Sequence, residues 1–183
     1  VRDSSGNIYV TGYTAGSLPD YSNAGGYDAF VAKYDSSGVL IWVRQIGTAS
    51  TDVGQAIDLD TSEEWVYIAG YTYGALQGTN AGSADIFYSK ISISNTSVTT
   101  RQFGTNLGDF VTDLKFGIAS SNFTSWTKTI LISGYTYGAF PGNTSAGEVD
   151  AFWAKCQETG QAMWPYTKTY TNTIYQFGSE IGR

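Results

Sequence analysis

Residues 70–78 read GYTYGALQG, residues 134–142 read GYTYGAFPG, and residues 12–20 read GYTAGSLPD. Stretches that share a Gly-Tyr-Thr opening, a second glycine and a Leu or Phe indicate an internal repeat. The opening glycines of the three stretches are 58 and 64 residues apart. This period fits a supersecondary unit, so the stretch is either a repeated functional site or a repeated corner of the fold.

Two further markers recur in the same order along the chain. The tripeptides DAF, DIF and DAF begin at Asp28, Asp85 and Asp150, and RQIGT at residues 44–48 returns as RQFGT at residues 101–105. Because the order of markers is constant, the chain consists of three copies of one unit. The third copy is longer, since GIASSNFTSWTKT precedes its ILISGYT. We expect these extra residues to lie in a connection.

Each unit contains four strand-like runs, which are clearest in the second copy as GQAIDLD, WVYIAGYT, DIFYSKI and SVTTRQFG. The elbow is defined here as the recurring nonapeptide, which begins at the end of the second run, together with the rest of the long connection to the third run. The three elbows span residues 12–27, 70–84 and 134–149. Several runs are apolar on both faces, which a sheet with one solvated face would not show. We expect the elbow glycines to make room for a neighbouring blade. The pattern predicts an all-β fold, a β-propeller with three four-stranded blades.

We predict a single β-propeller region over residues 1–183, with repeats at about 1–52, 53–109 and 110–177. The final run QFGSEIGR aligns with DVGQAIDL of the second copy. Residues 178–183 are therefore expected to start the innermost strand of a further blade or to close the first blade. Three blades are fewer than the usual four to eight of a closed ring. We expect a segment of a larger propeller or, less favoured, half of a six-bladed ring made by two chains.

The composition excludes several classes of function. The net charge is -6 and the isoelectric point is about 4.4, so the chain lacks the basic surface that nucleic-acid binding requires. It has no run of about eighteen apolar residues that would insert into a membrane. It contains no histidine and one cysteine, Cys156, which excludes an internal disulfide, a zinc site and a Ser-His or Cys-His nucleophile pair within the chain. We expect no metal and no cofactor.

The segments GNIYVTGYTAGSLPD at residues 6–20, GGYDAFVAKYDSSGVLIWVRQIGT at residues 25–48 and DVGQAIDLD at residues 52–60 resemble the SBBP repeat. This is the beta-propeller repeat of large secreted and cell-surface proteins. The resemblance is weaker in the third copy, where WPYTKTY replaces WVRQIGT and puts Pro165 in the expected outermost strand, a position that tolerates proline. The resemblance implies a propeller, an extracellular or cell-surface setting, and no catalytic residues.

The candidate ligand-binding residues are the repeated elbow side chains Tyr13, Asp28, Tyr71, Asp85, Tyr135 and Asp150. In one interpretation each elbow binds a sugar or a calcium ion through stacked tyrosines and an aspartate oxygen. In the other, the aspartates accept backbone N–H groups of the elbow and the tyrosines fill the wedge between blades. The structural interpretation is favoured, because calcium takes about six oxygens and each elbow offers one carboxylate.

Three Asn-x-Ser/Thr sequons, at Asn95, Asn122 and Asn143, are candidates for N-glycosylation. All three fall in expected connections between strands, where a glycan would not disturb a sheet. The acidic residues outside the repeated positions, such as Glu63 and Glu64 in an expected turn, are scattered. They do not form a recognisable glycosidase pair.

These observations predict a non-catalytic extracellular module for structural assembly, adhesion or protein–protein interaction. Its expected partners are other protein chains or the remaining blades of the same propeller, with neither nucleic acid nor membrane insertion. Three alternatives remain. They are a lectin that binds glycans at the Tyr/Asp elbows, a building block of an extracellular surface filament and, least favoured, a propeller of the glycoside hydrolase type.

Overall fold

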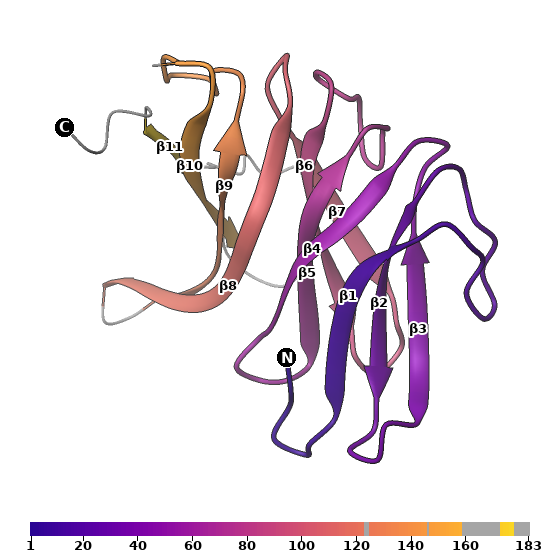
Figure 1. Cartoon of the computed structure of the whole chain (residues 1–183). Helices are drawn as coiled ribbons and strands as arrows, with labels where there is room; N and C mark the ends of the chain where they lie inside the picture. Colours follow the sequence, from indigo (N-terminus) through magenta and orange to yellow (C-terminus); the bar gives the residue numbers. More distant parts are fainter. Residues whose placement is uncertain (123–124, 146, 159–172, 178–183) are drawn as a thin grey trace.

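The computed structural model describes residues 1–122, 125–145, 147–158 and 173–177, which fold into three antiparallel sheets (Figure 1). The first sheet contains β1 (Ile8–Thr14), β2 (Asp28–Tyr34) and β3 (Leu40–Ile46). The second contains β4 (Asp52–Leu59), β5 (Trp65–Thr72), β6 (Asp85–Ser92) and β7 (Val98–Phe103). The third contains β8 (Asp109–Asn122), β9 (Ser125–Thr136), β10 (Asp150–Glu158) and β11 (Thr173–Phe177). No helix that could span a membrane occurs in these ranges.

Each sheet is a meander in which strands that follow one another in the chain are neighbours. The order is β4-β5-β6-β7 in the second sheet, and β8 to β11 follow the same order in the third. Figure 1 shows the sheets stacked in chain order, with the second sheet between the other two. The all-β prediction is confirmed. Within the described part of the chain the first sheet has three strands, and the three sheets do not close into a ring.

The second sheet is apolar on both sides because it is covered on both sides. Val66, Ile68 and Phe87 lie on the face that packs against the first sheet, which we call the front face. Tyr67 and Tyr88 lie on the opposite side, the back face, which packs against the third sheet. Alternate residues of a strand point to opposite faces, so a strand with both faces in a core needs apolar side chains throughout.

The glycines of the second strands make room within their own sheets. A Cβ on Gly70 would lie 1.8 Å from the carbonyl oxygen of Val53 and 3.1 Å from the ring of Phe87, both on neighbouring strands of the same sheet. A Cβ on Gly12 would likewise lie 3.0 Å from the ring of Phe30. The expectation that these glycines admit a neighbouring blade is therefore wrong. The phenylalanine of the third strand lies across the glycine of the second.

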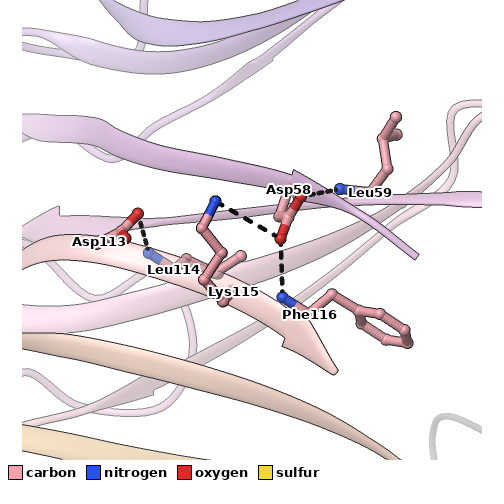
Figure 2. A network of polar contacts seen from close by, with 6 residues as sticks. All are labelled: Asp58, Leu59, Asp113, Leu114, Lys115 and Phe116. Atoms are coloured by element: carbon pink, nitrogen blue, oxygen red, sulfur yellow. Dashed lines mark hydrogen bonds and ion pairs between the residues drawn. The ribbon is translucent and has the colours of Figure 1, made fainter. Parts of the chain in front are cut away.

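A carboxylate joins the innermost strands of the second and third sheets. Asp58 on β4 accepts a 3.0 Å hydrogen bond from the backbone N–H of Phe116 on β8, and Figure 2 shows its side chain pointing at that strand. The Nζ of Lys115 lies 3.9 Å from the same carboxylate. Lys115 is exposed, so this ion pair stabilises the junction only weakly. The charged acceptor on a backbone N–H is the stronger contact.

The third repeat departs from the sequence prediction in two places. The residues inserted before ILISGYT do not form an irregular connection, because β8 and β9 run on as paired strands as far as Asn122 and Ser125. The outermost strand is β11, in which Gln176 pairs with Phe152 as Gln102 pairs with Phe87.

Gln176 is therefore the counterpart of Gln102, and its alignment with the start of the innermost strand is wrong. The segment WPYTKTY, with Pro165, and residues 178–183 lie outside the described residues.

Candidate functional site

The elbows are held in shape by the threonine that ends each second strand. The hydroxyl oxygen of Thr72 accepts the N–H of Gly74 at 2.9 Å, and that of Thr136 accepts the N–H of Gly138 at the same distance. Thr14 forms the corresponding bond in the first elbow at 3.1 Å. A hydroxyl that bonds the backbone two residues later stabilises a tight turn. This is the physical reason for the recurring Thr-x-Gly of the elbow.

A glutamine of the outermost strand fastens each elbow to its sheet. The side-chain oxygen of Gln102 accepts the N–H groups of Leu76 and Gln77, at 2.8 and 3.1 Å. Its side-chain nitrogen donates to the carbonyl of Gly74 at 3.0 Å and to Asp85 at 2.9 Å. One amide therefore satisfies backbone groups on both sides of the turn. Three of these bonds, to the N–H of the elbow Leu or Phe, to the glycine carbonyl and to the aspartate, recur at the two related glutamines, Gln45 and Gln176.

The repeated aspartates Asp28, Asp85 and Asp150 open the third strands of their repeats, as predicted. All three are buried. Asp28 accepts the N–H of Ala24 at 2.8 Å and Asp85 accepts the N–H of Ala81 at 2.9 Å, in addition to their glutamine contacts. These carboxylates accept hydrogen bonds from the elbow and do not face solvent. Their arrangement supports a structural role rather than ligand binding.

Two further buried aspartates, which sequence reasoning missed, open the innermost strands. Asp52 accepts the backbone N–H of Thr48 at 2.6 Å and also bonds the hydroxyl of Thr72. Asp109 accepts the N–H of Thr105 at 2.6 Å. The signal was present as a Gly-Thr pair followed four residues after the threonine by aspartate, in GTASTD and GTNLGD.

Burial raises the pKa of Asp52, against the lowering effect of its hydrogen bonds from Thr72 and Thr48. The nearby charge of Asp28 raises the pKa of Asp52 further. Asp109 follows the same pattern, with burial as the main cause and Asp85 as the neighbouring charge. At each junction between sheets, burial and the charge of a nearby carboxylate therefore disfavour the ionisation of one aspartate, Asp52 or Asp109.

The elbow tyrosines, by contrast, reach the surface. Tyr13 is 55% exposed, Tyr73 and Tyr137 are exposed, and Tyr135 is 37% exposed. Tyr71 is half-buried, because its ring lies 4.9 Å from the ring of Phe110 on the next sheet. Tyr71 therefore fills the wedge between two sheets, whereas its counterparts in the other repeats face solvent.

Aromatic side chains from all three repeats are here called the aromatic patch: Tyr13, Tyr27, Tyr71, Tyr73, Phe110, Tyr135 and Tyr137. Ring contacts connect Tyr71, Tyr73, Phe110, Tyr135 and Tyr137, and Tyr13 and Tyr27 form a further ring pair. The Phe110 ring stacks on Tyr135 with centroids 5.1 Å apart, and Tyr13 meets Tyr27 edge-on at 5.2 Å. Burial raises the pKa of Tyr71, and so do the neighbouring hydroxyls of Tyr73, Tyr135 and Tyr13. Tyrosines from all three repeats therefore lie near Tyr71.

The remaining candidate groups show little chemistry. Burial raises the pKa of the Cys156 thiol to about 12, against a lowering hydrogen bond with Tyr88, so this thiol is a poor nucleophile. Groups of three or more Asp, Glu, Cys or His side chains that could hold a metal ion do not occur among the described residues. What the patch offers is a set of aromatic faces and phenol hydroxyls, which suits binding.

The sequons differ in their surroundings. Asn95 is exposed in the turn between β6 and β7. Asn143 is half-buried in the third elbow, where its side-chain nitrogen donates to the carbonyl of Pro141 at 3.3 Å. Asn122 is the last residue of β8 rather than part of an irregular connection, so its expected placement is wrong. Between Asn95 and Asn143, the exposed Asn95 has the environment better suited to a glycan.

No curated protein matches the chain. A family model described as the beta-propeller repeat, SBBP, matches residues 1–19 and 41–77. The matched residues contain β1 and part of the first elbow, and then most of β3, all of β4 and β5 and the start of the second elbow. The resemblance noted in the sequence is thereby confirmed for residues 1–19 and 41–77, which are similar to the SBBP beta-propeller repeat.

Proposed function

We propose that this chain is a three-bladed part of a β-propeller that works as a non-catalytic extracellular module and binds a protein partner through its aromatic patch. The observation that carries the proposal is the gathering of exposed tyrosines from all three repeats on one surface. The extracellular setting rests on the resemblance to repeats of secreted and cell-surface proteins.

Exposed aromatic rings in a cluster are costly to leave in water and are typical of contact surfaces. Tyrosine is enriched among the residues that dominate the energy of protein–protein interfaces, because it adds a large rigid area and a hydroxyl. The rings of Tyr135 and Tyr137 have centroids 6.1 Å apart and meet nearly at right angles, so they support each other's orientation. A partner would therefore meet a surface that is largely pre-organised.

Catalysis by this site would need a group that can exchange protons with a bound molecule. The carboxylates nearest to the elbow, such as Asp85 and Asp109, are fully buried; Asp85 accepts the N–H of Ala81 in the elbow, and Asp109 accepts the N–H of Thr105. The exposed groups of the patch are phenols, whose ordinary pKa is about 10. This arrangement supports binding better than turnover.

A lectin is the second candidate, and the exposure of Tyr13 and Tyr135 favours it, because sugars stack on open aromatic faces. The buried aspartates of the elbows do not supply the hydroxyl acceptor of the Tyr/Asp site. A sugar would instead find phenol hydroxyls and the backbone of the elbow. We rank this candidate second, because the polar groups that orient a sugar are few on the patch.

The test compares the chain with a variant in which Tyr13, Tyr73 and Tyr137 are alanine. All three side chains are exposed, so the variant is expected to fold as the wild type does. A displayed library of random peptides is selected on the wild-type chain, and a glycan array is probed in parallel. The selected peptides are expected to bind the variant at least about tenfold more weakly, a loss of about 1.4 kcal/mol.

The matched control is Val39→Ala with Ile41→Ala, which removes exposed apolar side chains outside the patch. Peptide binding should be unchanged in this control. Absence of any selected peptide, or equal binding by the tyrosine variant, would overturn the protein-binding proposal. Glycan binding that the tyrosine variant loses would move the lectin into first place.

A further inference from the structure

The two interfaces inside the molecule follow one rule. The front face of the second sheet, with Val66, Ile68 and Phe87, packs on the back face of the first sheet, which presents Tyr9 and Val31. The front face of the third sheet packs on the back face of the second in the same way. Every interface therefore joins one front face to one back face, and never two like faces.

Among the described residues, this rule leaves one back face without a covering sheet, on the third sheet. Leu131 takes the place that Tyr67 has in the second sheet, and the exposed fraction of the side chain is 43% for Leu131 against 2% for Tyr67. Leu131, Ser133, Trp153 and Lys155 line a hollow of about 590 Å³ on this face. The corresponding side chains of the second sheet are covered by a neighbouring sheet.

The rule also leaves one front face open, on the first sheet. Ile8 takes the place of Val66, and its side chain is 40% exposed whereas that of Val66 is fully buried. Val10 and Phe30, the counterparts of Ile68 and Phe87, are half-buried. Leu40 adds a further exposed apolar side chain where β3 pairs with Tyr34. The open front face thus has the chemistry that a back face accepts inside this molecule.

We infer that the open back face of the third sheet binds the open front face of the first sheet in a second copy of this chain. The two faces belong to the outer sheets of the stack, with the second sheet between them (Figure 1), and the sheets do not close. In the described part of the chain, the two faces of one molecule therefore do not meet. A second copy fits this place because it brings the same kind of front face that the back faces of the first two sheets already bind, so the new interface would continue the existing stack.

Such an interface is head-to-tail, because each copy contributes a different surface. Interfaces of this kind lead either to a closed ring or to an open chain of copies, according to the rotation between neighbours. The surfaces differ from the aromatic patch except at the edge of the patch near Tyr135. The inference therefore goes beyond the proposed function, and each can fail without the other.

The test measures the mass of the wild-type chain by sedimentation equilibrium, from about 1 to about 100 µM protein. The expected result is reversible association. Leu131→Glu, on the open back face, and Ile8→Glu, on the open front face, should each weaken association by at least about tenfold. Both side chains are exposed, and circular dichroism checks that both variants keep the β fold.

The decisive measurement mixes the two variants. The intact back face of Ile8→Glu can pair with the intact front face of Leu131→Glu, so the mixture should form a complex of one molecule of each although neither associates alone. An interface between like faces would not give this result. Leu107→Glu is the matched control, because Leu107 has a similar exposure and lies on neither face. It should associate as the wild type does.

A wild-type chain that stays monomeric over the whole concentration range would overturn the inference. Association that resists both face variants, or a mixture that does not associate, would overturn it as well. Peptide binding by the aromatic patch is read in a separate experiment, so failure here leaves that proposal intact.

Discussion

The second and third sheets carry the same repeated pattern and differ in what covers them. Position for position, Tyr67 and Leu131 lie on the back face of a central strand, yet only Tyr67 is buried. The second sheet has a neighbour on each side, and the third has one in the described part of the chain. Burial at a given position of the repeat therefore depends on the neighbouring sheet rather than on the residue itself.

The phenylalanine of the third strand gives the most direct test of whether burial depends on the neighbouring sheet. Phe87 is fully buried between two sheets, whereas its counterpart Phe30 lies on the open front face and is half-buried. Phe87→Ala should lower the free energy of unfolding by about 3–5 kcal/mol, through lost burial and the cavity that remains. Phe30→Ala should cost about half of that or less. Urea denaturation measures both, and equal losses would contradict the dependence on neighbours.

The glutamine contacts are expected to behave differently from the phenylalanines, because they lie within one sheet and its elbow and should not depend on a neighbouring sheet. Gln102→Ala in the second sheet and Gln176→Ala in the third each remove bonds to an elbow and to a buried aspartate. Each should lower the free energy of unfolding by about 1–3 kcal/mol, since buried polar groups lose their partners. A loss confined to Gln102→Ala would contradict this expectation, because it would show that the contribution of the glutamine depends on the neighbouring sheets.

The smallest effect concerns the junctions between sheets, where burial raises the pKa of Asp52 and Asp109. A carboxyl whose pKa is raised by folding stabilises the fold when protonated. That contribution is present below the unfolded pKa of about 3.8 and is lost as the pH rises through the folded pKa. Asn mimics the protonated form. The double variant Asp52→Asn, Asp109→Asn should therefore gain stability relative to the wild type as the pH rises, by about 1.4 kcal/mol per unit of pKa shift.

This gain is measured as the difference between urea unfolding free energies of the double variant and the wild type, from about pH 4 to pH 7. Asp20→Asn, at an exposed position, shows how the loss of one surface charge alone affects the profile. A difference that stays flat with pH would mean that the two carboxyls titrate alike in the folded and unfolded chain.

Much of the fold could be predicted because the repeats are close to one another. The four runs of the second copy correspond to β4, β5, β6 and β7, and the aspartates that open the third strands lie where expected. The third copy was harder, since its insertion continues two paired strands and its glutamine, Gln176, follows a different local sequence. Spacing between markers cannot show whether an insertion extends a hairpin or loops out.

The candidate site was predicted in part. The sequence identified the tyrosines and aspartates of the elbow, but it could not separate them by exposure. Asp85 is buried at the start of the third strand, whereas Tyr73, in the turn of the same elbow, is exposed. The role of Gln102 was missed, because a recurring glutamine looks like any polar residue until the strand pairing places it beside Gly74 and Asp85.

The repeat, the strands and the turn chemistry could be read from the sequence, because these depend on the order of residues over short distances. The hydroxyl of Thr72 accepts the N–H of Gly74 two residues later, and Gly12 faces Phe30 within one sheet. The covered faces, the exposed tyrosines and the carboxylates that meet across a junction follow from the tertiary structure alone. Those properties depend on the stacking of whole sheets: the ring of Tyr71 contacts Phe110 on the next sheet, whereas Tyr13 is exposed to solvent.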